Sequence, residues 1–274
     1  MGRVLPEGEE GIVVICQEET GARAPPLETY VTGALAASIP IGCQEETLKA
    51  QAVILRTLCM WAYENSKDGR IDAQDLGQEY LGMEELQKAW GADFEVNREK
   101  LEQAVSATAG IYMTYEGGPM EPAYFWLSAG STRDGGEVLG EGYGYLSQVD
   151  CGHDMESDAY LSSLEMEEER FWELLEIPRQ SRLALTRDSA GYVLWMEAGE
   201  ERISGERVRS LFGLASSCFD VVSKDGRVEF TCKGVGHGLG FCQYEADRRA
   251  GGGADYLTLL KAFFRDVEME KIAE

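Results

Sequence analysis

The segment from Glu45 to Ala62 repeats apolar side chains at the spacing of an α-helix. They form one stripe along it, made of Leu48, Ala52, Leu55, Leu58, Cys59 and Ala62. Such a helix must bury its apolar stripe against another element, so the segment predicts a long helix packed on a core. Arg56 lies outside the stripe, and we expect its side chain to point toward a pocket.

Helices and strands follow one another irregularly along the chain. Helical spacing predicts helices at 27–37, 83–90, 98–108, 165–175, 206–211, 243–250 and 256–264, with Asn97 as the N-cap of the third. Strand-like runs lie at 11–16, 111–115, 123–127, 183–187, 192–197, 202–203, 219–222 and 227–231, and the second and third read as a pair. Because there is no regular β-α-β alternation, the predicted class is α+β, with helices and antiparallel strands mixed. We expect a single domain over residues 1–274, with a loop or insertion near 66–82.

The composition excludes some classes of partner. Lys and Arg number 25 against 49 Asp and Glu, so the net charge of −24 repels phosphate backbones, and nucleic acid is not expected as a partner. The seven scattered cysteines lack the spacing of a disulfide scaffold and are interpreted as small buried residues. No run approaches the ~20 apolar residues that cross a bilayer, and the N-terminus shows no hydrophobic signal region. We therefore expect a soluble chain as given.

The densest chemical signal is the glycine-rich segment Gly234–Tyr244, which contains His237. Its glycines allow positive φ and a close approach to a ligand, and a helix is expected just after them. Histidine is scarce, with two in the chain. The alternative is a tight turn in which the imidazole only holds the loop, and the pattern alone leaves the two interpretations about even.

Two further motifs are weaker on their own. Ser128–Thr132 follows a predicted strand, where hydroxyls and amides can cradle sugar hydroxyls or an anion, although ordinary turn chemistry explains the motif better when it is taken alone. Cys151-Gly152-His153 resembles half of a zinc site, but no nearby Cys-x-x-Cys or second histidine completes four ligands. The sequence therefore predicts no bound metal and no cofactor.

Several blocks together resemble one family. LETYVTGALAASIP at Leu27–Pro40 resembles the SpoIID signature L-E-x-Y-L-x-G-V-V-A-x-E-M-P, and LKAQAVILRT at Leu48–Thr57 resembles its L-K-A-Q-A-V-A-A-R-T. Ser128–Thr132 loosely matches S-x-G-G-x-T, with Ser131 in place of the second glycine. Arg209–Leu214 resembles R-x-x-L-G-L, and Gly234–Tyr244 resembles G-x-G-H-G-x-G-M-S-Q-Y. The blocks occur in the family's order.

The resemblance implies a function. SpoIID proteins are sporulation lytic transglycosylases that cleave peptidoglycan glycan strands, so it implies a groove for alternating N-acetylglucosamine and N-acetylmuramic acid. In the family one glutamate protonates the glycosidic oxygen and then acts as base while a 1,6-anhydro ring closes. Ser38 occupies that position here. Arg56 matches the family's active-site arginine, and the remaining expected substrate-binding residues are Ser128, Gly130, Thr132, Tyr143, Tyr145, His237, Gly238, Gln243 and Tyr244.

A serine hydroxyl titrates far too high to act as that acid, so we expect a glycan-binding protein with weak or no activity. Two alternatives stay open: an active transglycosylase that uses a relocated acid, Glu45 or Glu46, and a non-catalytic interaction module. Glu28 lies ~15 Å along the same helix from Ser38 and is not expected to reach. The resemblance further implies an extracytoplasmic, wall-facing location, an N-terminal anchor that this chain lacks, and engulfment proteins as possible partners.

Overall fold

The computed structural model describes residues 12–18, 21–67, 70–179 and 182–272. The chain divides into two compact units. Unit 1 comprises Met1–Pro122, Arg249–Lys261 and Asp266–Glu274, and unit 2 comprises Ala123–Arg248 and Ala262–Arg265. In sequence, unit 2 is inserted into unit 1. Helices and mostly antiparallel sheets occur in both, which confirms the α+β class, whereas the single domain over 1–274 stays a prediction.

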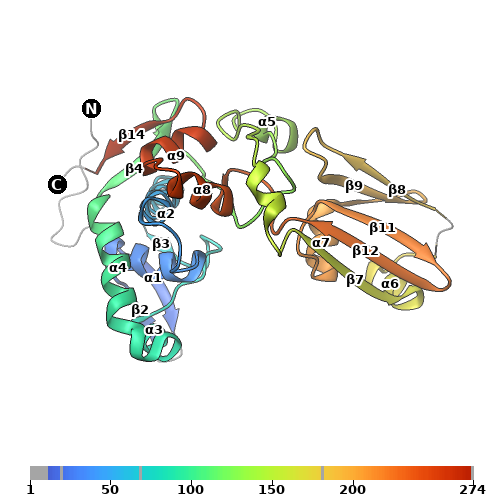
Figure 1. Ribbon diagram of the computed structural model, residues 1–274, viewed down its shortest axis with the longest axis horizontal. Coiled ribbons are helices and arrows are strands. Elements are labelled where there is room, and N and C mark those ends of the chain that lie inside the picture. The colour runs from blue at the N-terminus through green and yellow to red at the C-terminus, as the bar shows by residue number, and fades with distance from the viewer. Residues whose placement is uncertain (1–11, 19–20, 68–69, 180–181, 273–274) are drawn as a thin grey trace. The chain divides into compact units, whose positions relative to one another are not determined.

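Unit 1 is built around α2 (Glu45–Asn65), which packs with α1 (Leu27–Ser38) and α4 (Phe94–Ala107), as Figure 1 shows. The sequence predicts one buried stripe on α2, but every residue from Leu48 to Met60 except Lys49 is buried. Each fully buried leucine contributes about 1.5–3 kcal/mol, so α2 is a main source of stability in this unit. Its central position explains why polar residues such as Gln51 and Arg56 are also buried.

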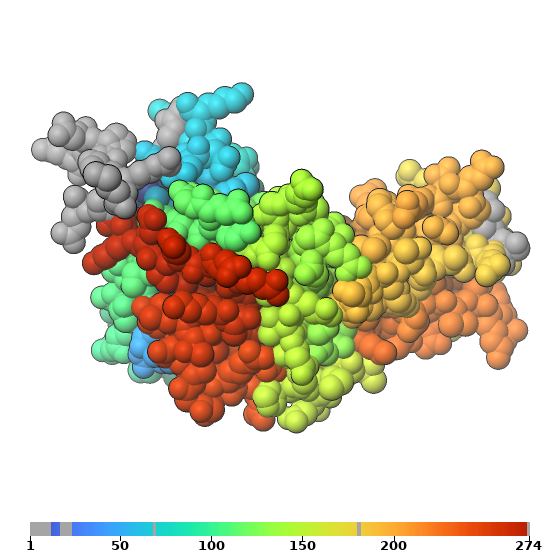
Figure 2. Space-filling model, turned by 90° about the horizontal axis from the view of Figure 1, so that it is seen from above, coloured from blue at the N-terminus to red at the C-terminus, as the bar shows by residue number. Residues whose placement is uncertain are grey.

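Unit 1 also contains two small sheets, two short helical elements and most of the helix α9 (Tyr256–Phe263). One sheet has the order β2 (Gly21–Arg23), β1 (Val14–Glu18), β3 (Ile71–Asp72), and the other has the order β14 (Glu268–Lys271), β4 (Ile111–Tyr115), β5 (Gly118–Pro119). The chain's last strand, β14, lies antiparallel to β4, and Figure 2 shows these red residues against green ones. The helix α3 (Met83–Trp90) is followed by the 3₁₀ turn η1 (Gly91–Asp93).

Unit 2 holds two three-stranded antiparallel sheets. One has the order β11 (Phe219–Lys224), β12 (Arg227–Lys233), β7 (Leu161–Glu167), and the other β10 (Glu201–Ser204), β9 (Val193–Ala198), β8 (Leu183–Arg187). The helices α6 (Glu168–Leu175) and α7 (Gly205–Phe212) join them in one apolar core. Within it Phe212 lies 5.2 Å from Phe171 and 5.1 Å from Phe230, between ring centroids. Aromatic pairs of this kind add about 0.5–1.5 kcal/mol each beyond area burial.

The short elements of unit 2 carry most of the predicted site. A parallel pair joins β6 (Tyr124–Phe125) to β13 (Phe241–Cys242), and α5 (Gly135–Val138) and η2 (Gly152–Glu156) lie in the long irregular segment between β6 and β7. The helices α8 (Gln243–Gly251) and α9 (Tyr256–Phe263) follow β13 and confirm the two predicted C-terminal helices.

Some sequence predictions were wrong in detail. The strand at 111–115 pairs with β5 and β14, not with 123–127, because the chain instead pairs β6 with β13. Asn97 lies inside α4, which begins at Phe94 directly after η1. The predicted helix at 165–175 begins at Glu168, because the preceding residues alternate in exposure and form β7. The described residues of the segment 66–82, which exclude 68 and 69, are irregular except for β3, and the first residue of the strand predicted at 11–16 lies outside the described residues.

Candidate functional site

Ser38 is the last residue of α1, immediately before Ile39 and Pro40. Its side chain is half-buried, and its Oγ donates a hydrogen bond of 3.3 Å to the carbonyl oxygen of Leu35 on the preceding turn. The last carbonyls of a helix carry partial negative charge, so a hydroxyl donor is well accommodated at this place. Ser38 therefore closes the end of a helix and offers no acid.

The loop between Ser38 and α2 is held by a cation from another helix. Lys100 of α4 donates hydrogen bonds of 2.7 Å to the Ile41 carbonyl and 2.8 Å to the Cys43 carbonyl. The Cys43 amide also donates to the Pro40 carbonyl at 3.1 Å. The loop after residue 38 is thus held mainly through its backbone carbonyls, two of which accept from the Lys100 side chain, and nothing in the sequence pattern singled out Lys100.

Arg56 is fully buried. Its Nε donates to Glu28 Oε1 at 2.8 Å, its Nη2 donates to Glu28 Oε2 at 2.6 Å, and its Nη1 donates to the Ile111 carbonyl at 2.9 Å. Glu28 Oε1 also accepts from the Gly110 amide at 3.1 Å. Bidentate arginine–carboxylate contacts are among the strongest hydrogen-bonded pairs in proteins. The guanidinium therefore joins α2 to α1 and β4.

The two alternative acids, Glu45 and Glu46, begin α2 and both contact Lys49. The Lys49 Nζ lies 2.6 Å from Glu45 Oε1 and 2.8 Å from Glu46 Oε1, and these hydrogen bonds raise the pKa of Lys49. Glu46 Oε2 also accepts from the Tyr256 amide at 2.8 Å. An ion pair requires a deprotonated carboxylate, whereas a general acid must carry a proton.

A pocket of about 400 Å³ opens in unit 1. Glu28 contributes its carboxylate to the lining, and Gly33, Tyr80, Leu86, Val105 and Ala109 contribute apolar or small surfaces. Ser38 is not among the lining residues, since the pocket lies beside the N-terminal half of α1.

In unit 2 the predicted loop at Ser128–Thr132 is tied into the structure. The Ser128 hydroxyl accepts from the Gly130 amide at 3.0 Å, and its own amide donates to Asp154 Oδ2 at 2.6 Å. Thr132 Oγ1 donates to the Ser147 carbonyl at 3.0 Å and accepts from the Val149 amide at 2.8 Å. Ser128 and Thr132 are buried, while Gly130 is half-buried.

His237 uses its ring to hold its own loop. Its Nδ1 accepts from the Leu239 amide at 3.1 Å, and a backbone contact with Tyr124 also reaches the ring. Burial, with the nearby Arg209 and Arg133 cations, lowers the pKa of His237 to about 4, against the opposite effect of Glu206. The imidazole is therefore neutral at physiological pH.

The two predicted loops of unit 2 lie side by side. The Leu127 amide donates to the Val235 carbonyl at 3.1 Å, the Val235 amide returns a bond of 2.7 Å, and the Arg133 amide donates to the Gly238 carbonyl at 2.8 Å. Gly238 is buried, and a Cβ there would lie 2.5 Å from Tyr192 Cζ. The structure thus brings the Ser128 and His237 loops together, although they are more than a hundred residues apart in the sequence.

The predicted aromatic residues differ in exposure. Tyr143 and Tyr244 are half-buried, whereas Tyr145 and Gln243 are buried. Tyr244 meets Trp126 edge to face, with ring centroids 5.9 Å apart. Tyr143 and Tyr244 therefore keep some ring surface for a ligand, and the partly exposed Trp126 is an aromatic that the motif reading missed.

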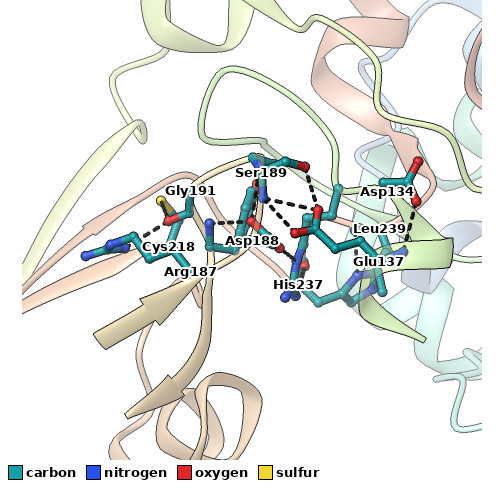
Figure 3. Close-up of polar contacts among 12 residues, drawn as sticks. Asp134, Glu137, Arg187, Asp188, Ser189, Gly191, Cys218, His237 and Leu239 are labelled. Atoms are coloured by element: carbon teal, nitrogen blue, oxygen red, sulfur yellow. Dashed lines mark hydrogen bonds and ion pairs between the residues drawn. The ribbon is translucent and has the colours of Figure 1, made fainter. Parts of the chain in front are cut away.

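Arg133 is a second buried arginine that sequence reasoning did not single out. Its Nε donates to Asp188 Oδ2 at 2.5 Å, and its Nη1 donates to the His237 carbonyl at 3.0 Å and to Glu206 Oε1 at 3.2 Å. Figure 3 shows Asp188 and His237 in this network, with Ser189 facing Glu137 beside it. Arg133 therefore holds the backbone of the His237 loop through its hydrogen bond to the His237 carbonyl.

Ser38 and Arg56 belong to unit 1, and the other predicted site residues belong to unit 2. Within the described residues, no helix is both long and apolar enough to cross a membrane.

Comparison with known proteins agrees with the motif resemblance. Residues 17–115 match the family model of SpoIID, the stage II sporulation protein. Stage II sporulation protein D of Bacillus amyloliquefaciens is 28% identical over 261 residues, which cover 90% of this chain and 74% of that protein. Its counterpart from Bacillus subtilis (strain 168) is 28% identical over 256 residues, covering 90% and 75%. An uncharacterized protein of Brachyspira hyodysenteriae is 26% identical over 254 residues, covering 89% and 66%.

The family match lies in unit 1, while the relatives extend the similarity through unit 2. The order of the motifs and the length of these alignments agree with one assignment. The motifs and the comparisons therefore agree in one similarity, to the SpoIID family of stage II sporulation proteins.

Proposed function

We propose that this chain binds peptidoglycan glycan strands and has lost most or all of the lytic transglycosylase activity implied by its SpoIID resemblance. The observation that carries the proposal is the hydroxyl of Ser38 at the end of α1, where the family motif places a glutamate. The proposal adds two statements to the sporulation-related role of the family. It names peptidoglycan glycan strands as the ligand, and it states that acid catalysis has been lost.

The chemical argument concerns a single proton. A carboxyl group at the C-terminal end of a helix lies beside partial negative charge, which favours its protonated form and suits a general acid. A serine at the same place cannot deliver a proton near neutral pH. General acid catalysis supplies on the order of 10²–10⁴-fold in rate, so most of that factor is expected to be missing.

Other carboxylates of unit 1 are poorly suited to replace the acid. Glu45 and Glu46 are paired with Lys49, and Glu28 is held by the buried Arg56. In each case a cation occupies oxygen atoms of the carboxylate. These contacts support a binding protein over an enzyme with a relocated acid.

Recognition of sugar is supported by the half-buried residues of unit 2. Tyr143 and Tyr244 offer ring surface for stacking on sugar faces, and neutral His237 adds no charge of its own. We further propose that the protein works outside the cytoplasmic membrane, with engulfment proteins as possible partners. The net charge of −24 is compatible with a substrate whose polymer backbone is not phosphate.

The test is digestion of purified, peptide-stripped glycan strands, with mass spectrometry of 1,6-anhydromuramic products. The protein is compared with Ser38→Glu and with Ser38→Gln, which matches the glutamate in size but carries no acid. We expect product from Ser38→Glu alone, at a rate roughly 10²–10⁴ above the other two. Equal product from the unchanged protein would refute the loss of activity, and Glu45→Gln and Glu46→Gln would then locate the acid.

Binding is measured separately by co-sedimentation with insoluble, peptide-stripped sacculi. We expect the unchanged protein to co-sediment and Tyr244→Ala to bind roughly 5- to 150-fold more weakly, since stacking of one ring is worth about 1–3 kcal/mol by analogy with aromatic stacking on bases. Absence of binding by the unchanged protein, together with inactivity of Ser38→Glu, would favour the non-catalytic interaction module instead.

A further inference from the structure

Three buried side chains with metal-binding atoms meet in unit 2. They are Cys151, Asp154 and Cys242, and their nearest sulfur and oxygen atoms all lie within 4.8 Å of one another. All three residues are 0% exposed. Buried thiols are common as small apolar residues, but a carboxylate is rarely fully buried unless it is paired.

Each of the three residues is placed by a short, well-defined element. Cys151 immediately precedes η2, and Asp154 lies within it. Cys242 ends β13 and immediately precedes α8. The Gly130 carbonyl accepts from the Cys151 amide at 2.9 Å, which joins this corner to the Ser128 loop.

The Asp154 carboxylate is only half satisfied. Its Oδ2 accepts from the Ser128 amide at 2.6 Å and from the Cys242 thiol at 2.9 Å. Its Oδ1 is buried and has no hydrogen-bond partner among the described residues. A buried polar atom left unpaired costs about 1–3 kcal/mol, so this oxygen calls for a ligand.

We propose that Cys151, Asp154 and Cys242 bind one zinc ion. Zinc takes thiolates at about 2.3 Å and carboxylate oxygens at about 2.0–2.2 Å in tetrahedral geometry. Those bond lengths place two ligand sulfurs about 3.8 Å apart and sulfur and oxygen about 3.5 Å apart. The observed upper limit of 4.8 Å between the ligand atoms is close to both separations.

The donor set determines which metal is expected. Two thiolates with one carboxylate select zinc or another thiophilic ion over magnesium and calcium, which prefer oxygen ligands alone. Asp154 Oδ1 supplies the carboxylate ligand, and one water molecule completes the fourth position. The site is closed to solvent, as is usual for structural zinc rather than for a catalytic ion.

Neighbouring groups can balance the negative charge of the ligands. The Ser128 amide points at the Asp154 carboxylate, and the N-terminus of α8 begins directly after Cys242. Burial raises the pKa of the Cys242 thiol well above its usual range, so zinc must displace a proton when it binds.

His153 was half of the motif considered in the sequence, but the structure engages it elsewhere. Its Nδ1 lies 3.0 Å and 3.1 Å from the two carboxylate oxygens of Glu245, and 48% of its side chain is exposed. Cys242, which is distant in sequence, replaces it in the cluster.

The test is zinc content and affinity of the full chain, purified under reducing conditions and measured by elemental mass spectrometry and competition with a chromogenic chelator. We expect about one zinc per chain. Cys151→Ser and Cys242→Ser should each weaken binding by at least about 100-fold, because loss of an outer partner alone costs 10–100-fold. Cobalt(II) should show the sulfur-to-cobalt charge-transfer band of thiolate ligation.

Two controls keep the result interpretable. Cys218→Ala removes another buried cysteine of unit 2 outside the cluster and should leave zinc binding unchanged. Asp154→Asn keeps the size of the side chain but should weaken binding, and circular dichroism shows whether each variant is folded. Zinc should also raise the Tm of the unchanged protein and not that of Cys242→Ser.

Three outcomes would overturn the proposal. The first is reduced, folded protein that binds no more zinc or cobalt than Cys242→Ser. The second is equal loss of zinc in Cys218→Ala. The third is a Cys151–Cys242 disulfide that persists through purification under reducing conditions, detected by peptide mass spectrometry.

Discussion

Glu28 and Arg56 form a two-pronged ion pair in which the guanidinium is completely buried while 40% of the carboxylate side chain remains exposed. The unequal burial predicts unequal costs of substitution. Glu28→Ala leaves a buried cation unpaired and should lower the free energy of unfolding by about 3 kcal/mol. Arg56→Met leaves a carboxylate that water can reach, so we expect about half that loss. Urea denaturation of both variants measures the difference, and a larger loss in Arg56→Met would contradict this explanation.

The depressed pKa of His237 predicts a pH dependence of stability. The unfolded chain binds a proton near pH 6.5, whereas the folded protein keeps the ring neutral until about pH 4, mainly because of burial. The contribution is therefore fully present above pH 6.5, and stability falls on the order of 2–3 kcal/mol as the pH decreases from about 6.5 to about 4.

The matched variant for this prediction is His237→Asn, whose amide oxygen can replace Nδ1 as acceptor for the Leu239 amide. Denaturation at several pH values should give a shallower slope for the variant over that range, because the shared carboxylates cancel in the comparison. Parallel curves would show that His237 takes up its proton at the same pH in both states.

Gly240 is expected to be irreplaceable for a reason beyond its positive φ of 77°. A Cβ there would lie 2.1 Å from the carbonyl oxygen of Ala123, while a Cβ on Gly213, at φ 63°, meets nothing within 4 Å. We expect Gly213→Ala to cost about 1 kcal/mol from the left-handed backbone alone. Gly240→Ala should cost about 3 kcal/mol or more. Thermal denaturation of the two variants compares their losses of stability. Equal losses would mean that the loop around Gly240 can shift to accommodate the methyl group.

Lys100 should control the order of the loop that follows Ser38. Lys100→Met removes both donors to the Ile41 and Cys43 carbonyls. We expect amide hydrogen exchange at residues 41–47 to accelerate roughly tenfold, equivalent to about 1.4 kcal/mol of local stability. Lys88→Met, on the exposed face of α3, is the control and should leave these amides unchanged. Unaltered exchange in Lys100→Met would show that the loop is held by other contacts.

Much of the fold could be predicted from local patterns. The helices near 27–37, 45–62, 83–90 and 256–264 were found because their apolar residues recur at helical spacing. The strands predicted at 219–222 and 227–231 pair as the hairpin of β11 and β12, and Asp225 and Gly226 form the turn between them. Pairings between distant segments, such as β6 with β13, leave no signal in a local pattern.

The sequence motifs indicated which loops belong to the candidate site, but not which buried side chains contact one another. The motifs singled out the Ser128 and His237 loops, which lie side by side in the structure. Arg56 was expected to face a pocket, and its guanidinium forms an ion pair with Glu28. This partner was not predicted, because one sequence cannot show which carboxylate a buried cation will contact. The proximity of Cys242 to Cys151 was not predicted either, because the two residues are distant in the sequence.

The pairing of β14 with β4 has a consequence for synthesis. Thr114 leaves the ribosome long before Glu268, its partner in the register. At a translation rate of about 5–20 residues per second, one edge of β4 stays unpaired for roughly 8–30 s before β14 is synthesised. An open strand edge invites pairing with other chains. The newly made protein is therefore most exposed to misassociation during translation of its inserted half, and a chain interrupted before its last residues would keep that edge open permanently.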